Sequence, residues 1–158
     1  MTTQPLDPRV RDHDDRAEAR HLVKECKAHP NDAQLWLRTA LLLDSLDREA
    51  TAIPHYEHAL KLGLSQEDER TALICLASSH RNLRRPDEAL AILRRARRRF
   101  PGDAAVESFY ALALLDAGDP RGAVRILGMA LVAAAGPHGL QGFEQALLTK
   151  FRGVTRRS

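Results

Sequence analysis

The sequence predicts an all-α fold in which pairs of helices repeat along the chain. Alanine returns at fixed positions in three consecutive segments of about 34 residues, and apolar residues recur at three- and four-residue steps. Aromatic residues make up only 4% of the 158 residues, whereas hydrophobic residues of all kinds make up 44%. A core of small and aliphatic side chains suits closely packed helices better than a sheet sandwich.

The first predicted element is a helix over residues 16–29. Its Leu22, Val23 and Cys26 follow the spacing of one helix face, and we expect them to face the first repeat. An array of helix pairs leaves an apolar face open at each end, so this helix is interpreted as a cap.

Three repeats come next, at residues 33–66, 70–103 and 104–137. Positions 8, 20 and 27 of every repeat are alanine. These alanines are Ala40, Ala52, Ala59, Ala77, Ala89, Ala96, Ala111, Ala123 and Ala130. Side chains this small predict that two helices cross closely at each position.

A C-terminal capping helix is predicted over residues 139–151. Leu140, Phe143, Leu147 and Phe151 recur at three- and four-residue steps, with polar residues on the other face. We expect these four side chains to pack on the third repeat.

The repeats and both caps are expected to form one domain over residues 16–152. The N-terminal arm, residues 1–15, and the tail, 153–158, are predicted to be disordered. The arm lacks the apolar core of a signal peptide, and no apolar run approaches the ~20 residues that span a bilayer. A cytoplasmic location is the expectation.

The repeat positions resemble the tetratricopeptide repeat (TPR) family, which places small residues at positions 8, 20 and 27. Trp36 and Leu73 also match its large residue at position 4, whereas Glu107 departs from it. The resemblance covers residues 30–137 and is closest to small stand-alone bacterial members. It implies a right-handed α-solenoid of three helix-turn-helix repeats with flanking capping helices.

In this family the first helix of each repeat lines a concave groove. The resemblance therefore implies an aliphatic groove with a polar rim that binds a peptide or protein segment. The residues at the inward-facing positions are Leu37, Leu41, Asp44, Ile74, Ser78, Arg81, Asn82, Ser108, Leu112 and Leu115. An alternative is that the N-terminal helix or a second copy of the chain covers this surface.

A basic patch ends the second helix of the second repeat, in a chain of net charge +3. Cations at a helix C-terminus are favoured by the helix dipole, so a solvated helix face is the preferred interpretation. Contact with an acidic partner is the alternative, and no aromatic residues interleave to stack on nucleic-acid bases. The patch consists of Arg94, Arg95, Arg97, Arg98 and Arg99.

No catalytic constellation and no cofactor motif are found in the sequence. His55 and His58 share a helix face, but two imidazoles do not complete a metal site, and we expect ordinary exposed histidines. Cys26 and Cys75 stand alone without disulfide or metal-ligand spacing, so they are expected to be inert core thiols.

The predicted function is that of a non-enzymatic adaptor or scaffold that binds a protein or peptide. Two alternatives stay open. One is a specialised chaperone for an apolar client, such as a secretion-system subunit. The other is a self-associating structural protein, for example a homodimer, without a groove ligand. Membrane partners are not expected, and nucleic acid is disfavoured.

Overall fold

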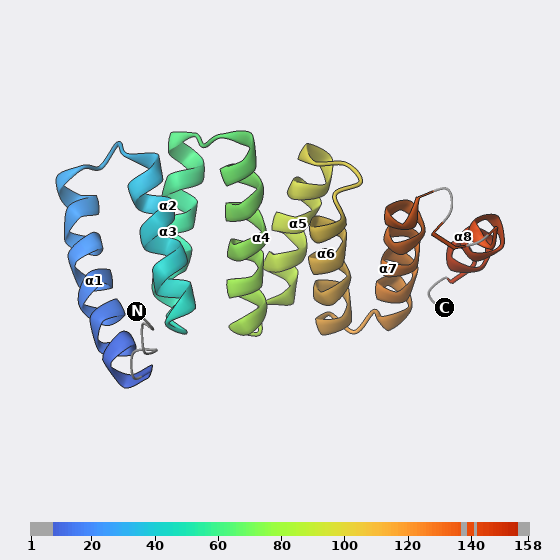
Figure 1. Cartoon of the computed structure of the whole chain (residues 1–158), viewed down its shortest axis with the longest axis horizontal. Coiled ribbons are helices and arrows are strands. Elements are labelled where there is room, and N and C mark those ends of the chain that lie inside the picture. The colour runs from blue at the N-terminus through green and yellow to red at the C-terminus, as the bar shows by residue number, and fades with distance from the viewer. Residues whose placement is uncertain (1–7, 137–138, 141, 155–158) are drawn as a thin grey trace, which may run out of the picture. The chain divides into compact units, whose positions relative to one another are not determined.

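The computed structural model describes residues 8–136, 139–140 and 142–154. Its regular secondary structure there is entirely α-helical, which confirms the predicted fold class (Figure 1). The helices are α1 (Pro8–Ala28), α2 (Ala33–Ser45), α3 (Glu49–Leu62), α4 (Gln66–Asn82), α5 (Pro86–Arg99), α6 (Ala104–Asp116), α7 (Pro120–Ala135) and α8 (Glu144–Arg152).

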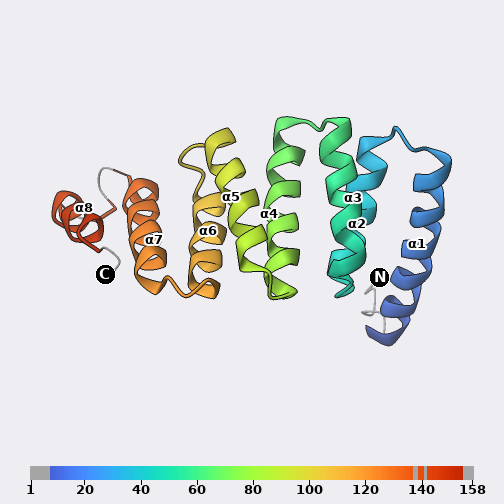
Figure 2. The same cartoon turned by 180° about the vertical axis from the view of Figure 1, so that it is seen from behind.

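The chain divides into two compact units, residues 1–75 and 76–158, and the division lies within α4. In the first unit α1 packs on α2 and α2 packs on α3. In the second unit α5 packs on α6, α6 on α7 and α7 on α8. The pairs α2–α3 and α6–α7 run antiparallel, as both views show (Figures 1 and 2).

The repeated alanines lie where the helices meet. Eight of the nine are buried, and seven of these have no exposed surface. The ninth, Ala130, is half-buried. In the second unit the buried core is almost entirely alanine, leucine and isoleucine, as the low aromatic content predicts. Close helix contacts are therefore the main source of packing in both units.

Aspartate side chains cap the N-termini of three helices. Asp32, Asp103 and Asp119 each accept a hydrogen bond from the backbone N–H three residues later, at 3.0, 2.9 and 3.0 Å. Such caps satisfy a donor that has no partner within the helix. Gly118 precedes the last of them with φ +79°, which only glycine adopts readily, and so permits the tight turn between α6 and α7.

Buried polar groups of the first unit are held by hydrogen bonds. The Cys26 thiol lies 3.2 Å from Thr39 Oγ1, and the Tyr56 hydroxyl donates to Asp44 at 3.3 Å. Burial raises the pKa of Tyr56, and Cys75 and Asp44 raise it further. Burial likewise raises the pKa of both cysteine thiols, which are therefore protonated and poorly nucleophilic at neutral pH.

The terminal helices differ from their predicted bounds. Helix α1 begins at Pro8, so residues 8–15 are helical and not part of a disordered arm; proline suits the first helical position. Helix α8 begins at Glu144, after Gly142 adopts φ +88°. The predicted disorder of residues 1–7 and 155–158 lies outside the described residues.

Candidate protein-interaction surfaces

Large aliphatic side chains are exposed on two neighbouring helices of the second unit, α6 and α7. Their exposed fractions run from 38% to 56%. Apolar surface of this kind, when it is contiguous, marks an interaction site more often than chance exposure does. The residues are Leu112 and Leu115 of α6 and Val124, Leu127 and Leu131 of α7.

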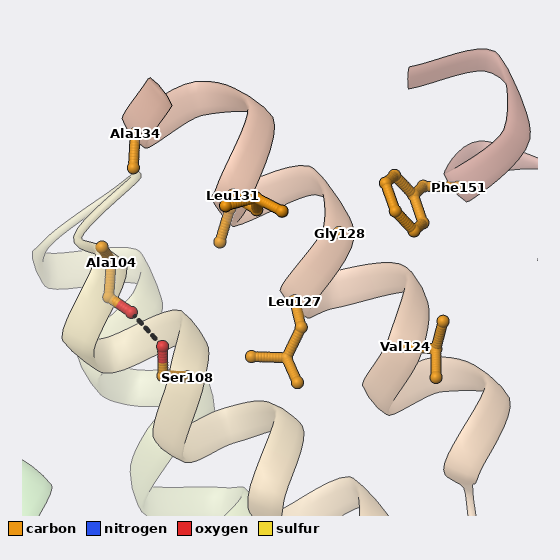
Figure 3. Close-up of a pocket in the computed structure, with 9 residues that line it drawn as sticks. Ala104, Ser108, Val124, Leu127, Gly128, Leu131, Ala134 and Phe151 are labelled. Carbon is orange, nitrogen blue, oxygen red and sulfur yellow. Dashed lines mark hydrogen bonds between the residues drawn. The ribbon is translucent and has the colours of Figure 1, made fainter. Parts of the chain in front are cut away.

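An apolar pocket of about 530 Å³ lies over α7, between α6 and α8. Figure 3 shows Leu127 and Leu131 between Ser108 on one side and the Phe151 ring on the other. Ser108 is the one polar side chain among the described residues that line the pocket, and its hydroxyl already donates to the Ala104 carbonyl at 2.7 Å. The lining residues are Ala104, Ser108, Val124, Leu127, Gly128, Ala130, Leu131, Ala134 and Phe151.

Phe151 forms one wall of this pocket by contacting the backbone of α7 at Gly128. A Cβ atom placed on Gly128 would overlap the Phe151 ring. Phe143, which was expected to pack on the third repeat with Phe151, is instead 66% exposed. Helix α8 therefore covers α7 only in part, and we call the open space between α6 and α8 the end slot.

Two of the predicted groove residues are buried. Leu37 and Ile74 have 3% and 8% of their surface exposed, so they belong to the core of the first unit and could not form an open groove floor. Their repeat position faces the neighbouring helices more than the solvent. Leu41 is 37% exposed and is the accessible aliphatic residue among the groove positions of α2.

Two of the polar groove residues, Arg81 and Asp44, are hydrogen-bonded to side chains outside the predicted groove set. Arg81 Nε donates to Asp116 Oδ2 at 2.6 Å, and the Arg81 side chain is only 17% exposed. Asp44 accepts from the Tyr56 hydroxyl. Ser78 is half-buried, whereas Asn82 is exposed.

A family model described as the tetratrico peptide repeat matches residues 33–157. This range includes all three repeats and α8, and it agrees with the buried alanines and the paired helices. The chain belongs to the tetratrico peptide repeat family. Domains of this TPR family are generally protein–protein interaction modules and are typically non-catalytic, so the family implies protein partners. A comparison with curated proteins found no matching relative.

The arginines of this TPR chain's basic patch have different environments. Arg97 Nε donates to Glu107 Oε1 at 2.8 Å, and its guanidinium lies 4.4 Å from the centroid of the Tyr110 ring. Arg99 lies 5.6 Å from the Phe100 ring. Arg94, Arg95 and Arg98 are exposed at the surface. Arg97 of the patch therefore links α5 to α6 through Glu107 and Tyr110. The sequence did not predict this contact.

The two histidines pack around Trp36 in the first TPR repeat. Ring centroids lie 5.1 Å apart for His55 and 4.2 Å apart for His58. His55 is 8% exposed, so the expectation of an exposed histidine was wrong for it: the imidazole fills space beside the indole. Among the described residues no group of three or more metal-ligating side chains comes together. None of the described helices is long and apolar enough to cross a membrane.

The end slot was missed because its residues match the repeat pattern. Leu127 and Ala130 occupy positions that are buried in the other repeats, and the sequence therefore assigns them to the core. A signal was present, since residues 138–158 do not continue the alanine pattern and supply only a short apolar stripe to cover α7.

Proposed function

We propose that this TPR protein is an adaptor that binds a polypeptide segment through exposed aliphatic residues on the first helices of its repeats. Leu41 of α2 and Leu112 and Leu115 of α6 present these side chains, with exposed fractions of 37%, 38% and 53%. Burying each one on a partner would contribute free energy in proportion to the apolar area removed from water.

The observation that supports the proposal best is that these leucines stay exposed on helices whose other faces are packed. On α6, Val106, Ala111 and Ala113 have no exposed surface, so the helix has a complete inner face and a separate outer one. An outer face of leucine costs solubility and adds nothing to the core, which favours a role in binding. An extended apolar peptide or an amphipathic helix would fit such a face.

Affinity recovery from a native lysate, with mass identification of the recovered proteins, tests this function. We expect the full chain to recover a polypeptide that both Leu41→Asp and Leu112→Asp fail to recover. Aspartate at these exposed positions leaves the core intact and places a charge in the proposed contact. Unchanged helical circular dichroism would show that both variants fold.

Arg98→Ala is the matched control, because Arg98 is exposed and lies on the basic patch. Recovery by this variant together with loss in the leucine variants would support the proposal. Loss in Arg98→Ala alone would place binding on the basic patch, and a wild-type chain that recovers nothing specific would contradict the adaptor role.

A further inference from the structure

Three arginines from three helices line a second pocket of the second unit, with a volume of about 400 Å³. Arg94 lies on α5, Arg125 on α7 and Arg152 at the end of α8. Each helix from α5 to α8 packs on the next, which brings these residues together although they are far apart in the sequence. This arginine pocket shares no lining residue with the end slot. Its other lining residues are Tyr110, Leu114, Asp119, Gly122 and Val154.

The three guanidinium groups have no partner within the described part of the chain. No hydrogen bond, ion pair or ring contact there involves Arg94, Arg125 or Arg152. Arg94 and Arg152 are exposed, and Arg125 is half-buried. By contrast, Arg97, on the same helix as Arg94, is bonded to Glu107. The planar sets of N–H donors on the three pocket arginines are therefore available to an anion.

The carboxylates near the arginine pocket do not neutralise it. Asp119 is the one carboxylate among the described residues that line it, and its Oδ1 accepts from the Gly122 N–H at 3.0 Å. The positive end of the α7 dipole offsets the charge of this cap. Glu107 and Asp116, on the facing helix α6, are each bonded to an arginine outside the pocket. Three cations and one carboxylate give the arginine pocket a net charge of +2.

This charge and these donors fit a phosphate monoester. Such a group carries about −1.5 to −2 charges at pH 7 and three acceptor oxygens. A guanidinium fork can bind two phosphate oxygens at once. A carboxylate has a single charge and only two oxygens, so it would leave part of the positive charge uncompensated.

A nucleotide base finds little support in the same pocket. Tyr110 is the one aromatic side chain among the described lining residues, and it is half-buried. The Arg97 guanidinium lies 4.4 Å from the centroid of its ring and occupies one face. Since stacking on aromatic rings is a main contribution to base binding, the pocket favours the phosphate group alone.

We propose that the arginine pocket binds a phosphate monoester, the group that a phosphorylated serine or threonine carries. The proposal goes beyond the adaptor function and does not depend on it, because the pocket contains none of the groove leucines. Residues 76–158 contain fourteen Lys and Arg residues against seven Asp and Glu, and this excess attracts anions toward the unit.

Nuclear magnetic resonance of the full chain, observing the arginine Nε–Hε signals, tests the proposal. The probe is a capped alanine–phosphoserine–alanine tripeptide in a buffer without phosphate or sulfate. We expect saturable shifts of the Arg94, Arg125 and Arg152 signals. Arg94→Gln, Arg125→Gln and Arg152→Gln should each raise the Kd by about fivefold or more, because each removes one charged donor group. The signals of the two remaining arginines report binding in each variant.

Three matched measurements control the result. Arg98→Gln removes the same charge from α5 at an exposed position outside the pocket, and it should leave the Kd within about twofold. A tripeptide with aspartate in place of phosphoserine should bind at least about fivefold more weakly. Circular dichroism should show that the glutamine variants stay folded.

The proposal is overturned if the phosphoserine tripeptide causes no saturable shift, or if Arg98→Gln weakens binding as much as the pocket variants do. Equal affinity for the aspartate tripeptide would show a general anion site and would remove the phosphate. Inorganic phosphate that binds where the phosphoserine tripeptide does not would show that the pocket takes the free ion, and would overturn the monoester.

Discussion

At the residue scale, the same side chain in the same repeat position has a different role according to the helix that packs over it. Ala96 is fully buried because α6 packs over α5, whereas Ala130 borders an open pocket. Position 24 of the repeat, which holds a large residue, follows the same rule. Tyr56 and Leu93 occupy it in the first two repeats and have no exposed surface, whereas Leu127 in the third repeat is 42% exposed. The repeat pattern in the sequence therefore predicts which residues can pack against a neighbouring helix. Whether such a residue is buried depends on the helix that lies over it.

Tyr56 is expected to make stability depend on alkaline pH. Burial, with Cys75 and Asp44 beside it, raises its pKa above the ordinary value of about 10. The unfolded chain then loses the phenol proton at lower pH than the folded chain does. The stabilisation from this group is complete below about pH 10 and is lost as pH rises through the folded value.

Urea unfolding at pH 8 and near pH 11 checks this expectation with Tyr56→Phe. The variant loses the hydrogen bonds and about 1 kcal/mol at pH 8. Its further loss toward pH 11 should be smaller than that of wild type, because it has no phenol to ionise. A wild-type slope that the substitution leaves unchanged would assign the alkaline loss to other groups.

Arg97 should stabilise the fold more than its neighbour Arg98. Arg97 bonds Glu107 and lies on the Tyr110 ring, both on α6, whereas Arg98 is exposed. Because Arg97 is still one-third exposed, solvent weakens the pair. We expect Arg97→Ala to cost about 1 kcal/mol and Arg98→Ala less than about 0.5 kcal/mol in urea unfolding. Equal losses would mean that the Arg97 contacts contribute nothing.

At the element scale, α8 is held by a contact that depends on a missing side chain. The Phe151 ring lies against α7 where Gly128 has no Cβ, and no residue of α8 is fully buried. Glycine inside a helix costs about 1 kcal/mol relative to alanine. The close approach of the ring gives a physical reason for glycine at this position.

A double-mutant cycle tests this contact. Gly128→Ala should displace Phe151, destabilise the protein by about 1 kcal/mol or more, and speed amide exchange in α8. In a Phe151→Ala background the same substitution should be neutral or stabilising by about 0.5–1 kcal/mol, since the ring is gone and alanine is the better helix former. An equal effect in both backgrounds would show that the ring is not the cause.

At the scale of the whole molecule, the sequence predicts the architecture much better than the binding surfaces. Nine alanines in register are enough to place the repeats, because helix crossing distance depends on local residue size. Which residues stay exposed for binding depends on the helix that packs over each repeat. The sequence of a single repeat does not contain that information. Leu37 and Ile74 were therefore assigned to a groove although they are buried, and Leu127 and Leu131 were passed over although they are exposed.

The bounds of the terminal helices were also beyond sequence reasoning. A capping helix has one partner, so its apolar spacing is short and irregular. Leu140 and Phe143 share the spacing of the apolar residues of α8, although that helix begins only at Glu144. Charge is divided along the chain as well, since most basic residues fall after residue 76.

The most direct test of the account compares leucine at the same repeat position in two repeats. Ala96 has no exposed surface, whereas Ala130 borders a pocket of about 530 Å³. In urea unfolding, Ala96→Leu should lower the free energy of unfolding by about 1–3 kcal/mol through overpacking, and Ala130→Leu by less than about 0.5 kcal/mol. Equal losses, or a larger loss at Ala130, would contradict both the close crossing of the helices and the open slot beside α7.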